Sequence, residues 1–419
     1  MKFQNVKGMK DILPGEVESW QLFERRTRQF LDAYGFQEIR TPVIEATELF
    51  QRSIGEASDI VHKEMYTFED RGGRSLTLRP EMTASVVRSA IEHRLIHENE
   101  PLYLYYLGPM YRAERPQAGR KREFFQMGVE TINTRSAVND AELLIMIKSY
   151  FDVFGLQKYK IKINNLGTEN DRLQYANRLK EYFTKHRDQL DEDSQFRLSK
   201  NVLRILDSKN PDLQKLIKAA PAIELSKEAR DDFEAIQKLL REAGVAYEID
   251  HRLVRGLDYY TGCVFEVTTA GLGAQDAILA GGRYDGLVAS LGGSHVGASG
   301  FAMGIERFLM ALEAEGISLA QALKTNLVYV AGLVHGESSC GFYRQIAQSL
   351  FRTGKQGRFS FGGKNIAKHL KQANKINAAL TIIVGENEYQ KKEVSIKNMT
   401  TGSQVTTPLA KLDEALKSC

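Results

Sequence analysis

Residues 102–132, LYLYYLGPMYRAERPQAGRKREFFQMGVETI, decide how this chain folds. Strand-forming runs rich in aromatic and aliphatic side chains occupy 102–107, 110–114 and 123–132. The last two flank RPQAGR at 115–120, where proline and glycine are typical of a turn. The pattern predicts antiparallel strands closed by a basic turn, which is a β-hairpin.

The strand predicted at 123–132 has two unlike faces, because side chains alternate along a strand. The core face carries Phe125, Met127, Val129 and Thr131. The other face carries Phe124, Gln126, Gly128 and Glu130. An antiparallel sheet often leaves one face in water, so a solvated second face is one interpretation and a binding face is the other.

The hairpin also concentrates positive charge beside an aromatic ring. Its cations are Arg112, Arg115, Arg120, Lys121 and Arg122, and Phe124 follows them. An aromatic ring can stack on a nucleotide base while guanidinium groups bind phosphates bidentately. The alternative is an exposed basic hairpin without a ligand, and the hairpin alone does not decide between them.

The rest of the chain adds helices and a second kind of domain. A helix and a short strand occupy 20–42, and another helix is expected to start at Pro80. Residues 167–244 are charged and helical in period, which predicts an inserted helical subdomain, and strand formers return at 257–268. After Lys324 the alternation of strand and helix predicts a small α/β domain with parallel strands.

Composition is that of a soluble folded protein of two or three domains: 419 residues, 42% hydrophobic and 26% charged. No apolar run is long enough to cross a bilayer and no signal peptide is evident, so we expect no membrane association and a cytoplasmic location. Three scattered cysteines and unspaced histidines predict no zinc or other protein-built metal site. Phosphate-binding-loop, dinucleotide, metalloprotease and serine-hydrolase motifs are absent from the sequence.

Basic residues gather near the C-terminus. The net charge is +4, yet 325–419 holds 13 Lys and Arg against 6 Asp and Glu, and 344–375 holds eight basic residues and no acid. Four lysines with spacings of four, three and four share one helical face: Lys364, Lys368, Lys371 and Lys375. Their mutual repulsion would be relieved by a polyphosphate partner. A solvated lysine face is the ordinary alternative, and the missing acids favour nucleic acid.

Three further residues have both a structural and a functional interpretation. Arg307 follows Gly304 in the first turn of a helix, where the dipole disfavours a cation unless an anion also binds there, although its long stem could swing away. Glu81 in the turn after Pro80 favours a helix start without any function. Asp258 is explained equally well as a turn residue.

Taken together, the chain resembles the histidyl-tRNA synthetase family of class II aminoacyl-tRNA synthetases over essentially its whole length. Three class II elements occur in order: the helix and strand ending at Pro42, YRAERP at 111–116, and GFAMGIER at 300–307. LVRGLDYY at 253–260 and AGGRYDGL at 280–287 are typical of the histidine enzymes.

The resemblance implies an α+β fold, with a class II antiparallel sheet flanked by helices. Its catalytic core would span 1–166 and 249–322, interrupted by a helical insertion at 167–248. An α/β anticodon-binding domain would follow at 325–419. The family also implies a homodimer, with the segment around Pro42 at the interface.

The resemblance implies ATP-dependent activation of L-histidine to histidyl-adenylate and its transfer to the 3′ end of histidine tRNA, releasing AMP and pyrophosphate. The implied histidine-binding residues are Glu81, Thr83, Arg112, Gln126, Glu130, Arg255, Tyr259 and Tyr260. The implied ATP-binding residues are Arg112, Glu114, Arg120, Phe124 and Arg307. The basic run supplies the expected tRNA-binding residues Lys364, Lys368, Lys371 and Lys375.

Arg255 is the predicted catalytic residue. The substrate carboxylate is already a nucleophile, so activation needs no general base but in-line positioning and compensation of phosphoryl charge. We expect Arg255 to supply part of that charge, with Mg²⁺ on the outer phosphates. Neutral imidazole has one donor and one acceptor nitrogen, which Glu130 and a tyrosine hydroxyl can satisfy.

The chain departs from the family pattern at Met82, where many relatives have glycine, and at Phe125, where histidine is frequent. One rival is a non-catalytic paralogue that regulates the first enzyme of histidine biosynthesis, which usually lacks the C-terminal domain. Another is an RNA-binding protein with an inactive nucleotide fold. The intact set of Arg112, Arg255 and Arg307 disfavours the second.

Overall fold

The computed structural model describes all residues except 1–2, 56–57, 117–118, 209, 271, 273–275, 320–326, 335, 337–338, 363–364 and 419. The chain forms two compact units. The first combines residues 1–12 with 24–317, and the second combines 13–23 with 318–419. No helix in the described part of the chain is both long enough and apolar enough to span a bilayer.

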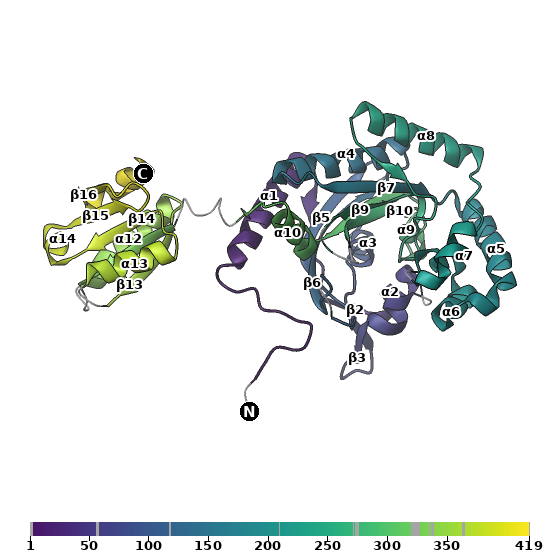
Figure 1. Ribbon diagram of the computed structural model, residues 1–419, viewed down its shortest axis with the longest axis horizontal. Helices are drawn as coiled ribbons and strands as arrows, with labels where there is room; N and C mark the ends of the chain where they lie inside the picture. Colours follow the sequence, from purple (N-terminus) through teal and green to yellow (C-terminus); the bar gives the residue numbers. More distant parts are fainter. Residues whose placement is uncertain are drawn as a thin grey trace. The chain divides into compact units, whose positions relative to one another are not determined.

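The first unit is built on a large sheet, in which eight strands can be traced among the described residues (Figure 1). In spatial order they are β1 (Gln37–Glu38), β5 (Leu102–Tyr111), β6 (Glu123–Ile132), β11 (Ala298–Gly304), β10 (Ala277–Arg283), β9 (Thr261–Thr269), β7 (Tyr159–Asn165) and β8 (Glu248–Ile249). The central strands are antiparallel, and only the edge pairs β1–β5 and β7–β8 are parallel. The expected α+β class with an antiparallel sheet is confirmed.

The predicted hairpin is the pair β5–β6, whose register ends with Tyr111 facing Glu123. Its turn includes 117–118, which lie outside the described residues. The two strands expected at 102–107 and 110–114 are in fact one, because β5 continues through Pro109 to Tyr111. Strand β1 pairs only with Leu104 and Tyr105, so no ladder with another described strand needs an N–H donor from Pro109 on that side, where the Arg79 side chain donates to the Pro109 carbonyl instead.

Helices α4 (Ala137–Phe154) and α10 (Ile305–Ala314) pack together through aromatic rings. Phe308 of α10 is fully buried, and its ring centroid lies 5.2–5.7 Å from those of Tyr150, Phe151 and Phe154. This packing fixes the rotation of α10 about its axis. The neighbouring residue, Arg307, consequently points away from that core.

Three smaller parts complete the first unit. Helix α3 (Thr83–Glu92) packs Val86 against Leu104 and Tyr106 of β5. A separate sheet of β2 (Ile44–Ala46), β4 (Ser75–Leu78) and β3 (Tyr66–Glu69) accompanies α2 (Thr47–Ile54). Between β7 and β8 the chain forms the helices α5 (Glu169–Lys185), α6 (Glu192–Lys200), η3 (Val202–Asp207), α7 (Gln214–Ala219) and α8 (Lys227–Glu242). We call the segment between β7 and β8 the helical insertion.

The second unit has a mixed sheet in the order β13 (Gln356–Phe361), β12 (Leu327–Gly332), β14 (Leu380–Val384), β15 (Glu393–Asn398) and β16 (Gln404–Pro408). Its helices include α12 (Cys340–Arg352), α13 (Ile366–Lys375), α14 (Glu386–Lys391) and α15 (Leu412–Ser418). The first three strands are parallel as predicted, whereas β15 and β16 are antiparallel. The prediction of parallel strands alone was incomplete, because the short link between β15 and β16 has no room for a crossover helix.

Candidate functional site

The site begins at the start of α3. The sequence predicted this helix from Pro80, but it starts at Thr83, with Glu81 just outside it. The Glu81 carboxylate accepts hydrogen bonds from the backbone N–H groups of Thr83 (2.6 Å) and Ala84 (3.0 Å). It therefore caps the helix, as the structural interpretation of Glu81 expected. Burial also raises its pKa, so it is more than a surface cap.

A second carboxylate, Glu130, lies beside it on the face of β6 that carries Phe124 and Gln126. Its side chain accepts from the Thr83 hydroxyl (2.7 Å) and from the Tyr284 hydroxyl. Only 1% of Glu130 is exposed, and burial raises its pKa to about 8. This face of the strand is thus enclosed at Glu130 rather than solvated.

Four tyrosines surround these two carboxylates. Tyr259 and Tyr260 were predicted, and their ring centroids lie 4.8 Å apart; that of Tyr284 lies 5.6 Å from Tyr259. Tyr106 of β5 is buried on the same side, within range of the charge of Glu130. Burial raises the pKa of Tyr260 to about 12 and raises the other three as well, so all four remain neutral hydroxyl donors.

Sequence reasoning missed Tyr284 and Tyr106 as site residues. Tyr284 stands in the segment AGGRYDGL, so a signal existed. Tyr106 is one of several tyrosines along β5, but alternation along the strand places it on the face opposite to Tyr103 and Tyr105, so a signal existed here too.

Three guanidinium groups gather near the turn of the hairpin. Arg112 donates to the backbone carbonyl of Pro80 (2.9 Å), and its guanidinium carbon lies 5.2 Å from the centroid of the Phe124 ring. Arg120 pairs with Glu114, with 3.0 Å between nitrogen and oxygen. Burial, and then the positive charge of Arg120, lowers the pKa of Arg307. The structure therefore brings all five predicted ATP-binding residues into one neighbourhood.

Arg307 reaches across from α10 to this group. Its Nε donates to the carbonyl of Gly119 (2.9 Å) and its Nη1 donates to that of Ala277 (2.8 Å). The preceding Glu306 accepts from the backbone N–H of Phe125 (3.0 Å). These contacts fasten α10 to the start of β6 and hold a cation beside the hairpin.

Arg255 lies in the loop before β9 and pairs with Glu266, 2.6 Å away. The positive charge of Arg255 acts on the Tyr260 phenol, and the charges of Glu81 and Glu130 act on that same phenol. The charge of Arg255 and those of both carboxylates thus act on one phenol. We call Glu81, Glu130 and the four tyrosines the carboxylate pocket. Sequence reasoning did not identify Glu266, which is one of several alternating polar residues on a strand.

Several buried polar atoms in this region have no hydrogen-bond partner. Two of them are Oε1 of Gln126 and Nε of Arg255. Unsatisfied buried groups are costly, and a ligand that pairs with them would remove that cost. Both atoms belong to residues expected to bind histidine.

Two acidic side chains near the guanidinium groups offer oxygen donors. Burial, and then the negative charge of Glu114, raises the pKa of Glu64. Mg²⁺ is usually bound by one or two carboxylates together with substrate phosphates, and Glu64 and Glu114, the latter already paired with Arg120, carry oxygen donors of that kind. Within the described residues, no three His, Cys, Asp or Glu side chains are grouped to hold a metal by themselves.

The predicted lysine face lies in the second unit. Lys368, Lys371 and Lys375 are all exposed on α13, whose opposite side buries His369 and Ala373. Lys364 lies outside the described residues.

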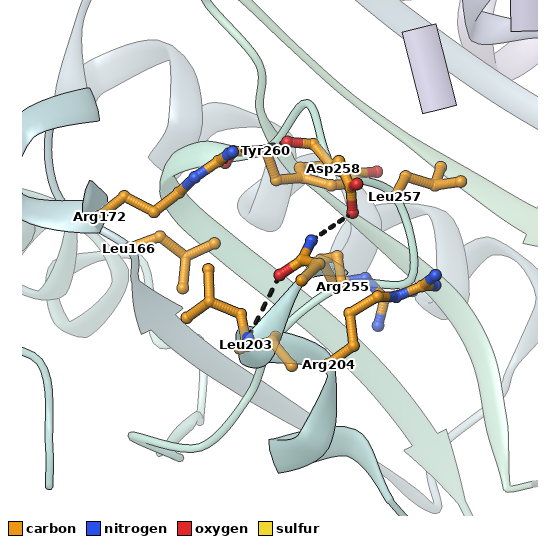
Figure 2. A pocket seen from close by; sticks show the side chains of 10 residues that line it. Leu166, Arg172, Leu203, Arg204, Arg255, Leu257, Asp258 and Tyr260 are labelled. Carbon is orange, nitrogen blue, oxygen red and sulfur yellow. Dashed lines mark hydrogen bonds between the residues drawn. The ribbon is translucent and has the colours of Figure 1, made fainter. Parts of the chain in front are cut away.

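A further pocket lies between the helical insertion and the loop that carries Arg255, and residues of both line it (Figure 2). Arg172 and Arg204 line it from the insertion, and Arg255, Asp258 and Tyr260 line it from the loop.

Comparisons with known proteins agree over the whole chain. A model of the family described as "Histidyl-tRNA synthetase" matches residues 8–308, and one described as "Anticodon binding domain" matches 328–418. The histidine–tRNA ligase of Chlorobium phaeovibrioides is 44% identical over 420 residues, covering 99% of this chain and 98% of that protein. That of Nitrosomonas eutropha is 45% identical over 412 residues, covering 97% of each. The apo crystal structure of S. aureus histidyl-tRNA synthetase has a TM-score of 0.80 at 35% identity, covering 99% of this chain and 100% of that one.

Proposed function

Since this chain belongs to the histidyl-tRNA synthetase family and is an enzyme that attaches histidine to histidine tRNA, we propose that the carboxylate pocket holds L-histidine and that the adjoining guanidinium groups hold ATP. One observation carries this assignment. Arg112 contacts Pro80, next to Glu81, and also lies over the Phe124 ring, so the two halves of the site meet at one side chain.

In the histidine half, Glu130 accepts a hydrogen bond from one imidazole nitrogen and a tyrosine hydroxyl serves the other. Glu81 and Thr83 meet the α-amino group, and Gln126 uses its unpaired oxygen to bind the substrate. A side chain without ring nitrogens would leave Glu130 and the phenols unpaired in a buried site. Such a loss discriminates strongly between amino acids.

In the ATP half, Phe124 stacks on the adenine, with Glu114 beside it. Arg112 binds the α-phosphate, and Arg120 and Arg307 bind the outer phosphates. Glu64 and Glu114 would supply oxygen ligands for Mg²⁺, which when bound neutralises charge on the outer phosphates. Burial, and then repulsion from Arg120, lowers the pKa of Arg307, and an anionic ligand would relieve that repulsion.

Activation joins the two halves. A carboxylate oxygen of histidine attacks the α-phosphorus of ATP, the bond to the β-phosphate oxygen breaks, and pyrophosphate leaves as histidyl-adenylate forms. Arg112 and Arg255 offset the charge that develops on the phosphoryl oxygens. In the second step a terminal ribose hydroxyl of the tRNA attacks the histidyl carbonyl carbon, and AMP leaves.

The remaining partners follow from the two units. The exposed lysines of α13 bind the tRNA phosphates, which the match to an anticodon-binding domain supports. The chain acts as a homodimer through the segment around Pro42, which leads into the small sheet where Ile44 (46%) of β2 and Phe68 (42%) of β3 are exposed. It acts in the cytoplasm. Cys263 and Cys340 form no disulfide, as is usual in a reducing compartment.

The decisive experiment is pyrophosphate exchange into ATP without tRNA, measured across a panel of amino acids. We expect exchange with histidine alone, and its loss in Arg255→Ala with histidine binding retained. Histidine binding without exchange would instead favour the regulatory paralogue. Weakened binding with an unimpaired chemical step would refute the role of Arg255.

A further inference from the structure

Three side chains of the helical insertion form hydrogen bonds to the loop that carries Arg255 (Figure 2). Arg172 Nη1 donates to the backbone carbonyls of both Asp258 and Tyr260, at 2.7 Å each. Asn201 Nδ2 donates to Asp258 Oδ1 at 2.7 Å. Arg204 Nη2 donates to the carbonyl of Gly256, the residue after Arg255. The insertion thus binds the loop at three positions along the segment from Arg255 to Tyr260.

The opposite side of the loop is held just as closely. The backbone N–H of Asp258 donates to the carbonyl of Ile54 at 3.2 Å. The Asp258 carboxylate lies over Gly55, where a Cβ would come within 2.3 Å of Oδ2. Asp258 therefore lies between the end of α2 and the insertion and is held from both sides.

These hydrogen bonds are polar contacts that are partly buried. Arg204 is 8% exposed, and its Nη1 has no hydrogen-bond partner. Arg172 serves two carbonyls that would otherwise have to find other donors. Burial raises the pKa of Asp258, and its bond from Asn201 partly offsets that cost. Such groups hold one loop geometry, because any other geometry leaves buried polar atoms unpaired.

We propose that Arg172, Asn201 and Arg204 are positioning residues for histidine activation. They touch no substrate, but they fix the 255–260 loop so that Arg255 faces the phosphoryl group and Tyr259 and Tyr260 close the histidine pocket. A part of the chain distant in sequence thereby completes the active site. The inference rests on the proposed role of Arg255.

Asn201→Asp tests the hydrogen bond from Asn201 to Asp258 with little change in the shape of the side chain. The new carboxylate still accepts from the backbone N–H of Leu203, as Asn201 Oδ1 does at 3.2 Å, so the start of η3 is kept. It cannot donate to Asp258, and two carboxylates then face each other. We expect kcat for pyrophosphate exchange to fall roughly tenfold or more, as the loss of a charge-assisted hydrogen bond implies, while the melting temperature changes little.

The double variant Asn201→Asp/Asp258→Asn restores one donor and one acceptor with their positions exchanged. We expect it to recover kcat to within about threefold of the parent, since the bond is reformed. Lys200→Gln is the matched control, because it makes the same change of charge at the neighbouring exposed residue and should leave kcat unaltered. A folded Asn201→Asp with normal kcat, or a double variant without recovery, would overturn the proposal.

Arg255→Ala distinguishes a failure of the proposed positioning role from a failure of the proposed catalytic role of Arg255. If Arg255→Ala abolishes exchange and Asn201→Asp does not impair it, only the positioning role fails. If Arg255→Ala exchanges normally, the proposed catalytic role fails first, and the positioning role fails with it because it depends on Arg255.

Discussion

Arg255 Nη1 donates to Glu266 Oε2 at 2.6 Å, which ties the loop before β9 to the middle of that strand. Both side chains are mostly shielded from water, so the pair is stronger than a surface ion pair. The charge predicted to act on the α-phosphoryl group is therefore held in place before any ligand arrives. Its Nε remains unpaired and open to a new partner.

Glu266→Gln should slow activation by releasing Arg255. The amide keeps the shape but loses the charge that orients the guanidinium, and we expect kcat for pyrophosphate exchange to fall about tenfold. Combined with Arg255→Ala it should cost nothing more, since both changes remove one interaction. Glu248→Gln, at an exposed carboxylate of the same sheet, is the control. Additive losses would show that Glu266 acts independently of Arg255.

Glu130→Gln should stabilise the ligand-free protein increasingly as the pH rises. Burial raises the pKa of Glu130 from 4.5 to about 8, so the folded state prefers the protonated carboxyl. The stability this proton gives is complete below the unfolded pKa and is lost as the pH rises toward 8. The glutamine has no such loss. The gain over the parent should grow between about pH 5 and 8 to a few kcal/mol, since one pKa unit is about 1.4 kcal/mol.

Urea unfolding of both proteins across this pH range measures that difference. A gap that is constant with pH would mean that Glu130 is ionised in the folded protein throughout. Glu130→Gln should at the same time bind histidine poorly, because the amide cannot ionise and so cannot offer the imidazole N–H the charged acceptor that a carboxylate becomes on binding.

Gly300→Ala should weaken histidine binding without contacting histidine. Gly300 faces Glu130 across β11 and β6, and a Cβ there would lie 2.3 Å from Glu130 Oε2 and 2.3 Å from the carbonyl of Val129. The carboxylate must shift, so we expect KM for histidine to rise roughly tenfold or more and KM for ATP to change little. Equal effects on both constants would indicate general damage to the sheet.

Charge reversal on α13 should impair tRNA binding, the function proposed for the second unit, and leave histidine activation in the first unit unchanged. Lys368→Glu/Lys371→Glu is expected to weaken tRNA binding. The slope of log K against log salt concentration should become shallower by about one per lysine, while tRNA-free exchange stays normal. Lys391→Glu/Lys411→Glu applies the same charge change at exposed lysines elsewhere in this unit. Exchange that falls together with binding would contradict the division of labour.

The sequence pattern predicted many helices and strands correctly, because the signals for such elements are local. Alternation along 123–132 separated Phe124 and Glu130 from the core face, and the position of Arg307 after Gly304 was predicted in the first turn of a helix, where it lies. The errors were local too: α3 starts at Thr83, and β5 runs through Pro109. Side-chain capping by Glu81 and the position of Pro109 on the side of β5 where β1 no longer pairs decide these boundaries, and a one-dimensional pattern shows neither.

The sequence by itself determined the strands, the hairpin, the family resemblance and the list of candidate residues. Only the tertiary structure decided which of them share a pocket. Tyr284 reaches Glu130 across 154 positions of sequence because β11 and β10 follow β6 in the sheet. Likewise, Asn201 meets Asp258 only because the helical insertion folds back over the loop before β9. Periodicity fixes the face on which a side chain lies, but strand order and the packing of distant segments determine its neighbours, and these depend on the burial of the whole chain.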